Sequence, residues 1–211
     1  HGVGFGVSSG VSLPGESTGR LNDPRNWRDI EQATLAFGYG ISVNTMQLVR
    51  AYSVLATDGI LRPLSIIKLE NIPPGRRVLG ADSTLKLRRM MEQVTTEGTG
   101  QAAAVAGYHV AGKTGTVHKS TARGYAEDRY LSLFAGMLPA SRPALVAAIV
   151  IDEPKSGEHY GGRVAAPIFA TVMREAARIL GLIPDVQDDV DDDRYRLAIS
   201  LEDDRNLGVA Q

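Results

Sequence analysis

A lysine, two threonine hydroxyls and a glycine stand together at the end of a short extended run, in the segment Val110–Thr116. Acyl transfer needs a nucleophile, a base, oxyanion donors and a means of orienting the substrate. An extended substrate can pair with an exposed strand, and Gly115 removes the side chain that would block its approach. Lys113 offers a cation, and Thr114 and Thr116 offer hydroxyls to a substrate carboxylate. The Thr116 N–H offers an oxyanion donor, and such a donor is worth roughly 3–4 kcal/mol of barrier. We therefore predict a substrate-orienting strand, with an ordinary surface strand ending as the alternative.

The serine that such a reaction needs has candidates by spacing, and we reject each on physical grounds. Ser65–Lys68 and Ser83–Lys86 match Ser-x-x-Lys, and Ser42–Asn44 matches Ser-x-Asn. The first match lies in a segment rich in β-formers, where side chains three positions apart point to opposite faces. The second match stands where a helix begins and is explained by ordinary capping. The third precedes both in the chain, and its asparagine is better used as a helix cap. We predict that this chain holds no nucleophile for the reaction.

Composition excludes several other classes of function. The chain has 211 residues, 43% hydrophobic and 22% charged, as an ordinary soluble globular protein has. A net charge of −1 gives no general basic surface for nucleic acid. The chain has no cysteine, and its 4 histidines lack ligand spacing, so we expect neither a metal site nor a cofactor. No apolar run approaches the roughly 18 residues that a membrane helix needs.

Capping signals and a 3.6-residue periodicity predict three helices. Asn44 and Gln47 have the spacing of a capping box at the start of the first. The predicted bounds are Asn44 or Thr45 to Asp58, Asp82 or Ser83 to Gly98, and Val164 to Leu180. The apolar stripes expected to face a core are Leu48, Tyr52 and Leu55 in the first helix, Leu87, Met90, Met91 and Val94 in the second, and Ile168, Val172, Ala176 and Ile179 in the third.

Strand patterns cluster in the second half of the chain. Three runs are predicted as strands: Tyr108–Val117, Tyr130–Met137 and Ala144–Ile151. Their short connections favour an antiparallel meander, and the continuously apolar third run predicts a strand buried on both faces. A short extended segment is also expected over Ile60–Leu69. Together with the helices, the strands predict an α+β fold, an antiparallel sheet flanked by helices.

The two ends of the chain differ in composition. Residues 1–184 predict one folded unit, whereas residues 185–211 begin with an acidic cluster and should form a solvated, flexible tail. Three strands would leave one sheet edge without a partner. We therefore expect the fold to be incomplete in this chain, which then belongs to a longer protein or is held to a second half.

These features, taken in order, resemble the C-terminal half of the transpeptidase domain of a class B penicillin-binding protein, of the division-specific type. The resemblance covers about residues 2–184, and Lys113–Gly115 is one of three motifs that this family assembles around a serine. The blocks that carry it are Gly10–Glu16, Ala36–Ile41, Gln47–Tyr52, Arg62–Lys68, Gly107–Thr116, Ile151–Pro154 and Tyr160–Phe169. The order and spacing of all the blocks make the resemblance specific.

The resemblance implies the penicillin-binding and serine β-lactamase-like fold and peptidoglycan D,D-transpeptidation. In that reaction a serine attacks the D-Ala-D-Ala end of a stem peptide, releases D-Ala and passes the acyl group to an amine of a second strand. β-Lactams trap the same serine. By resemblance, Lys113 and Thr116 are catalytic, and Thr116 N–H lines the oxyanion hole. The residues implied to bind substrate or form the wall of the cleft are Thr114, Gly115, Thr116, Tyr160, Gly161 and Gly162.

The resemblance also implies partners and a location. The partners are the stem peptide, β-lactams, the N-terminal half of the same domain and cell-division proteins. The location is the periplasmic face of the bacterial inner membrane, with the anchor outside this chain. The alternatives are an elongation-type class B relative and a non-catalytic β-lactam sensor or interaction module. A serine β-lactamase is disfavoured, because those enzymes usually lack the Tyr160–Pro167 block.

Overall fold

The computed structural model describes residues 2–11, 14–36, 38–121, 124–155 and 157–186. A three-stranded antiparallel sheet lies at its centre, in the order β3-β4-β5. The strands are β3 (Ala111–Thr121), β4 (Gly124–Leu138) and β5 (Leu145–Asp152). The predicted antiparallel meander is therefore confirmed.

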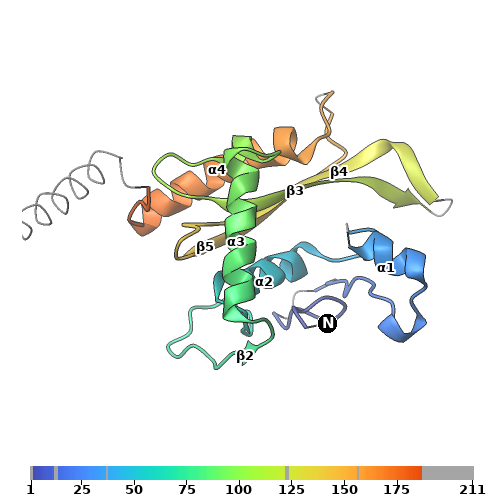
Figure 1. Cartoon of the computed structure of the whole chain (residues 1–211), viewed down its shortest axis with the longest axis horizontal. Helices are drawn as coiled ribbons and strands as arrows, with labels where there is room; N and C mark the ends of the chain where they lie inside the picture. The colour runs from blue at the N-terminus through green and yellow to red at the C-terminus, as the bar shows by residue number, and fades with distance from the viewer. Residues whose placement is uncertain (1, 12–13, 37, 122–123, 156, 187–211) are drawn as a thin grey trace, which may run out of the picture.

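Three longer helices surround this sheet. They are α2 (Thr45–Ala56), α3 (Ala81–Thr96) and α4 (Gly161–Leu180). Helix α4 lies on one face of the sheet and α2 on the other, while α3 runs across the strand direction and contacts β3 (Figure 1). This arrangement confirms the predicted α+β class, and it brings the start of α4 to the strand that carries the Lys-Thr-Gly segment. No helix in the described part of the chain is long and apolar enough to cross a membrane.

The remaining elements are short. They are η1 (Pro24–Asn26), α1 (Asp29–Leu35), β1 (Ile60–Leu61), β2 (Arg76–Arg77) and η2 (Gln101–Ala103). Helix α1 was not predicted. The extended segment expected over Ile60–Leu69 is a strand only at β1, which pairs with β2 and closes a loop over residues 62–75.

The β3–β4 hairpin is longer than predicted. The sequence predicted a polar loop between the first two strands, but β3 continues to Thr121 and β4 begins at Gly124. A register shift between His118 and Ser120 separates the inner part of the hairpin from its tip. The prediction failed because ladder hydrogen bonds come from the backbone, and polar side chains do not interrupt them.

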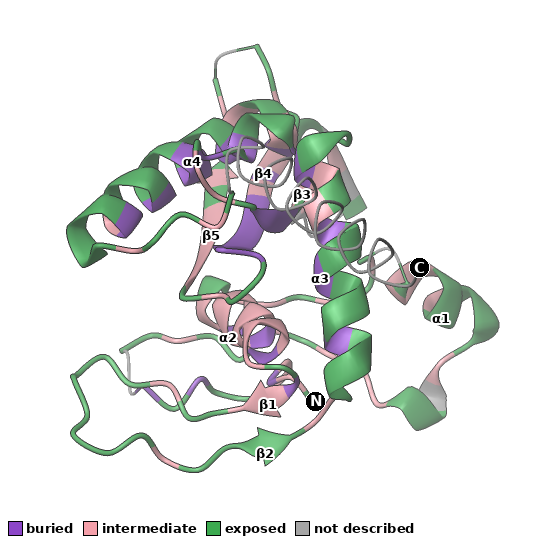
Figure 2. Ribbon diagram, turned by 60° about the vertical axis from the view of Figure 1, so that its left-hand side comes forward, coloured by how far each residue is buried: buried purple, intermediate pink, exposed green. Residues whose placement is uncertain are grey.

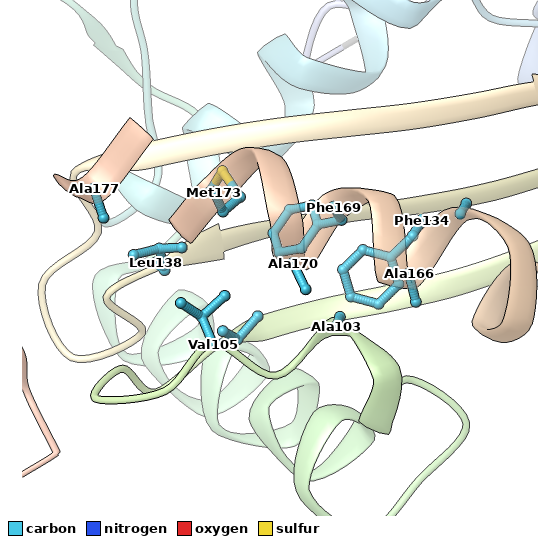
Figure 3. Close-up of a cluster of buried hydrophobic side chains, with 11 residues drawn as sticks. Ala103, Val105, Phe134, Leu138, Ala166, Phe169, Ala170, Met173 and Ala177 are labelled. Carbon is cyan, nitrogen blue, oxygen red and sulfur yellow. The ribbon is translucent and has the colours of Figure 1, made fainter. Parts of the chain in front are cut away.

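The main core lies between α4 and the sheet. Figure 3 shows Phe169 of α4 beside Phe134 of β4, and their ring centroids are 4.7 Å apart in a tilted arrangement. The buried members of this core are Ala103, Val105, Val110, Phe134, Leu138, Ala165, Ala166, Phe169, Ala170, Met173 and Ala177. Four alanines on the buried face of α4 bring the helix close to the strands, so backbone atoms at its start can meet β3.

The predicted apolar stripe of α4 is wrong by one position. Ile168, Val172 and Ile179 are 40%, 46% and 73% exposed, whereas Phe169 and Met173 are buried. Helix α4 has apolar residues on two faces, and periodicity alone does not say which one the sheet covers.

The stripes predicted for the other two helices are partly correct. In α3 the buried residues are Thr84, Arg88, Met91 and Thr95, so Met91 was predicted correctly and Met90, 61% exposed, was not. In α2 the buried residues are Gln47, Ala51 and Val54, but Tyr52 and Leu55 of the predicted stripe, partly buried, pack against the apolar cluster that contains Met91. Figure 2 shows burial concentrated where α4 meets the sheet, while most of α3 is exposed. Strand β5 is likewise not buried on both faces, because Val150 is 38% exposed at the edge of the sheet.

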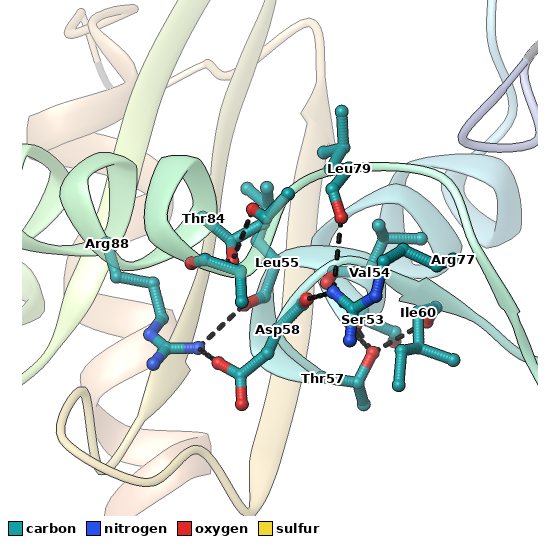
Figure 4. A network of polar contacts seen from close by, with 12 residues as sticks. Ser53, Val54, Leu55, Thr57, Asp58, Ile60, Arg77, Leu79, Thr84 and Arg88 are labelled. Atoms are coloured by element: carbon teal, nitrogen blue, oxygen red, sulfur yellow. Dashed lines mark hydrogen bonds and ion pairs between the residues drawn. The ribbon is translucent and has the colours of Figure 1, made fainter.

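Polar contacts join α2 to α3. The Arg88 side chain is nearly buried, and its Nη1 donates to Leu55 O at 2.9 Å and to Asp58 Oδ1 at 2.7 Å (Figure 4). Arg77 Nη1 donates to Asp58 O at 2.7 Å. These bonds satisfy carbonyl groups where α2 ends, which a helix cannot satisfy itself.

The N-terminal segment is held to the start of α2. The predicted capping box is confirmed, because Asn44 Oδ1 accepts from Gln47 N and Gln47 Oε1 accepts from Asn44 N. The fully buried Gln47 amide also donates to Val7 O and Thr18 O, both at 2.8 Å. Glu16 accepts from Ser9 N at 2.9 Å and from Asn44 Nδ2 at 3.0 Å.

The described chain ends against the body of the protein. Asp185 accepts hydrogen bonds from His109 N at 2.8 Å and from Ser141 Oγ at 2.6 Å. The predicted acidic tail starts here, and its residues 187–211 lie outside the described residues.

Candidate active site

Strand β3 presents its Lys-Thr-Gly-Thr side chains on two faces. Thr114 pairs with Phe134 and Thr116 with Ser132, so both hydroxyls lie on the face toward α4. Lys113 and Gly115 alternate with them. The strand therefore offers hydroxyls on one side and the lysine stem on the other.

The start of α4 is bonded directly to this strand. Gly161 N, the first N–H of α4, donates to Thr116 Oγ1 at 3.0 Å. A helix leaves its first N–H groups without a partner inside the helix, and the threonine oxygen satisfies one of them. This bond fixes the Thr116 hydroxyl oxygen relative to the helix.

The two glycines at this junction are required by the close approach of backbone to backbone. A Cβ on Gly161 would collide with the carbonyl oxygens of Gly115 and Leu133, and a Cβ on Gly162 would collide with the carbonyl oxygen of Thr99. Any other residue would push α4 away from the sheet. Gly161 and Gly162 therefore set the distance between helix and strand.

Thr99 joins the site and was missed by the sequence analysis. Its Oγ1 lies 2.8 Å from Thr114 Oγ1, in a hydrogen bond for which either atom can be the donor. The end of α3 is tied to the strand as well, because Thr95 Oγ1 donates to Val110 O at 2.5 Å. The available signal was a threonine between two glycines, Gly98 and Gly100, just after α3, and it did not indicate a partner 15 residues away.

An open pocket of ≈ 610 Å³ lies where these elements meet. It brings Thr114 and Thr116 together with Tyr160, Gly161 and Gly162, five of the residues singled out by the sequence analysis. Its full lining is Gly98, Thr99, Gln101, Ala102, Thr114, Thr116, Tyr160, Gly161, Gly162, Arg163 and Pro167.

Lys113 and Gly115 are not part of that lining. The Lys113 ammonium is exposed and donates to Thr114 O at 3.0 Å and Thr114 Oγ1 at 3.4 Å, so it sits beside a hydroxyl of the pocket. A Cβ on Gly115 would meet the side chain of Leu133 within 2.8 Å. Packing against Leu133 on the neighbouring strand therefore also requires a glycine at position 115, which the sequence did not reveal.

A second pocket, of ≈ 460 Å³, lies on the α2 side of the sheet. Its walls are the loop before α2 and the sheet residues Val117, His118, Leu131, Leu133 and Val150. Both glycines of the Gly38–Gly40 turn line it. Mainly apolar side chains thus face open space on this side of the strand.

A chain of four rings leads to Tyr160. His118 lies 4.5 Å from Tyr130, Tyr130 stacks on His159 at 4.1 Å, and His159 lies 4.5 Å from Tyr160, all measured between ring centroids. Ser132 Oγ also donates to His159 O. The rings support Tyr160 where it forms part of the pocket wall.

The base of the hairpin is held by an ion-pair cluster. Lys119 Nζ donates to Asp152 and, at 2.7 Å, to Glu153 Oε1. The hydrogen bonds that Lys119 donates, to Asp152 first and Glu153 second, raise its pKa above the usual range. The cluster fixes the hairpin close to the Lys-Thr-Gly-Thr segment.

The rejected serines lie elsewhere. Ser65 Oγ donates to Ile67 O at 2.6 Å in the exposed loop over residues 62–75, and Ser83 is exposed in the first turn of α3. Neither lines the pocket that holds Thr114 and Thr116. Within the described residues, no three His, Asp or Glu side chains gather as ligands of a metal ion would.

Comparison with known proteins gives a consistent result. The family described as the penicillin binding protein transpeptidase domain matches residues 1–174. A probable peptidoglycan D,D-transpeptidase PenA of Neisseria flavescens is 43% identical over 185 residues, 87% of this chain and 46% of that protein. The peptidoglycan D,D-transpeptidase FtsI of Escherichia coli K12 is 39% identical over 183 residues, 86% of this chain and 31% of that protein.

Solved structures agree with this result. The apo transpeptidase domain of penicillin-binding protein 3 from Burkholderia pseudomallei aligns with a TM-score of 0.83 and 42% identity, covering 88% of this chain and 57% of that chain. A Burkholderia ambifaria structure described as a peptidoglycan glycosyltransferase aligns with a TM-score of 0.78 and 36% identity, covering 89% of this chain and 56% of that chain. The chain spans less than half the length of the two curated relatives.

Proposed function

The chain belongs to the penicillin-binding protein transpeptidase domain family, and we propose that it supplies one wall of a peptidoglycan D,D-transpeptidase active site. The observation that carries the proposal is the Gly161 N to Thr116 Oγ1 hydrogen bond of 3.0 Å. It joins two sequence blocks, 45 residues apart, at one pocket. The proposed substrate is the D-Ala-D-Ala end of a stem peptide, and β-lactams are the inhibitors.

Each site residue has a proposed role. Thr114 and Thr116 bind the terminal carboxylate of the substrate, and Thr116 N–H is an oxyanion donor. Lys113 stabilises the anionic substrate and assists proton relay through the neighbouring hydroxyl, a role that fits its 3.4 Å distance from Thr114 Oγ1. Gly115 leaves no side chain that would block the approach of an extended substrate to the strand. Tyr160, Gly161 and Gly162 form the facing wall, supported by the ring chain that ends at Tyr160.

The nucleophile is proposed to come from the N-terminal half of the same domain. Three observations support this: the outer edge of β5 pairs with no described strand, Val150 is 38% exposed there, and an apolar pocket lies open on the α2 side. The Burkholderia pseudomallei domain is longer, since this chain covers 57% of it. Residues 1–211 alone should therefore not give a monomer that melts cooperatively, and such a monomer would contradict the proposal.

A septal role is the proposed subtype, because the relatives include proteins named FtsI. It places the whole protein at the periplasmic face of the inner membrane with cell-division partners. Depletion of the protein should produce filaments, since blocked septation does not stop elongation. Rounded cells would favour the elongation-type alternative. Acylation by penicillin without D-Ala release from a stem peptide would favour a non-catalytic sensor.

The central test is acylation of the intact transpeptidase by a fluorescent penicillin. Lys113→Ala should abolish labelling, since such electrostatic groups contribute about 10²–10³-fold to the rate. The folded fraction should not change, because the Lys113 side chain is exposed. Matched controls are Lys68→Ala and Ser65→Ala, which alter the exposed loop and should label normally. Near-normal labelling of Lys113→Ala, or a labelled Ser65 or Ser83 in a peptide map, would contradict the proposal.

A further inference from the structure

The pocket beside Thr114 and Thr116 has a one-sided charge. Its polar side chains are three threonine hydroxyls, the Tyr160 phenol, the Gln101 amide and the guanidinium of Arg163, and none of the described residues that line it is acidic. The Lys113 ammonium lies just beyond, 3.4 Å from Thr114 Oγ1. A ligand that matches this lining carries a negative charge and accepts hydrogen bonds.

The Arg163 side chain belongs to this lining and has no polar partner among the residues that the structure describes. It stands in the first turn of α4, is exposed, and forms no ion pair or side-chain hydrogen bond with any described residue. The other arginines of α4 behave differently. Arg178 Nε lies 3.0 Å from Glu175 Oε2, and Arg174 Nε lies 3.7 Å from Glu175 Oε1.

The hydroxyls beside Arg163 are already oriented. The Thr116 oxygen accepts from Gly161 N, so its own O–H remains to be donated. Thr99 and Thr114 share one hydrogen bond, which uses one of their two protons and leaves the other for the pocket. A carboxylate placed here would accept from these hydroxyls on β3 while pairing with a cation on α4.

We propose that Arg163 is a carboxylate-binding residue of this site. With Thr116, it holds the terminal carboxylate of the D-Ala-D-Ala substrate, or of the β-lactam that replaces it. The inference rests on the proposed function and adds a cation from α4 to a carboxylate site otherwise built on β3. Arg163 thus increases the preference of the enzyme for a free carboxylate over a neutral end.

The test compares two probes that differ only in this charge, benzylpenicillin and its methyl ester, on the intact transpeptidase. The quantity measured is the ratio of their second-order acylation rate constants. Arg163→Gln should lower the acid-to-ester ratio about fivefold or more. This expected size exceeds that of a fully exposed ion pair and is smaller than that of a charged hydrogen bond shielded from water. For benzylpenicillin, the fall in the second-order rate constant should come from weaker initial binding. The rate of the acylation step itself should change little.

Two further variants separate charge from structure. Arg163→Lys should restore part of the ratio, because lysine keeps the charge but not the planar fork of arginine. Arg174→Gln removes a positive charge from the same helix outside the pocket and should leave the ratio unchanged. Added salt should lower the acid-to-ester ratio of the wild type more than that of Arg163→Gln. Salt screens the Arg163 charge, which is present only in the wild type.

The possible results have distinct meanings. An unchanged ratio in Arg163→Gln, or an equal loss with acid and ester, overturns this inference and leaves the proposed function standing. A wild-type protein that neither probe acylates overturns the proposed function, and this inference with it. An equal fall of the ratio in Arg174→Gln also overturns the inference, because the effect would then come from net charge.

Discussion

The two faces of the sheet are built differently. On the α4 face a continuous apolar core excludes water, and glycine contacts fix the helix against β3. On the other face the buried apolar set is small, and polar contacts through Gln47, Arg88 and Asp58 hold α2, α3 and the N-terminal segment together. Apolar side chains such as Met90 stay exposed there. Among the described residues, the α4 face therefore depends mainly on apolar packing and the α2 face more on polar contacts.

The largest expected effect tests the packed face. Phe169→Ala in the intact protein should lower the free energy of unfolding by about 3–5 kcal/mol, because it removes a fully buried ring that lies against Phe134. Chemical denaturation measures the change. The control is Thr171→Ala, an exposed position on the same helix that should change stability by less than about 0.5 kcal/mol. A cost below about 1 kcal/mol for Phe169→Ala would show that this face is not the main core.

A smaller effect is expected at the polar junction of the other face. Arg88→Met keeps most of the side-chain volume but leaves Leu55 O and Asp58 without their donor. The expected cost is about 1–3 kcal/mol, since an acceptor that loses its partner at a helix end is destabilising. Arg89→Met, at the exposed neighbouring position, should be close to neutral in the same denaturation experiment. A cost for Arg88→Met as large as that for Phe169→Ala would mean that the two faces contribute equally.

The smallest effect is a pH dependence of the N-terminal segment. The hydrogen bond from Ser9 N is the largest cause that lowers the pKa of Glu16 from 4.5, and side-chain bonds from Ser8, Ser9 and Asn44 add to it. A lowered folded-state pKa means that the stabilisation is present above pH 4.5 and is lost as pH falls through the lower value.

Hydrogen exchange of residues 7–11 and 14–18 between pH 6 and pH 3 tests this dependence, after correction for intrinsic exchange rates. Protection should fall toward the acid end in the wild type and should already be reduced in Glu16→Gln at pH 6. Glu70→Gln, in the exposed loop over residues 62–75, is the matched control. Equal acid sensitivity of wild type and Glu16→Gln would remove Glu16 from the contacts that hold this segment.

Local signals in the sequence predicted much of the fold. The Asn44 capping box, the three-strand meander and the helix that ends at Gly181 depend on interactions a few residues apart, so a single sequence reveals them. The family resemblance, now confirmed, depends on such local blocks in order. The offset stripes show the limit: Ile168 and Phe169 are both apolar, and only packing against the sheet distinguishes them.

The candidate site divides in the same way. The residue types at 113–116 and 160–162 could be singled out from the sequence because hydroxyls, glycines and a lysine at that spacing suit acyl transfer. Three features came only from the tertiary structure: Thr99 meets Thr114, Gly161 and Gly162 admit no side chain, and Arg163 lines the pocket with no partner among the described residues. The physical reason is that each depends on segments distant in the chain, which meet only when the helices pack against β3.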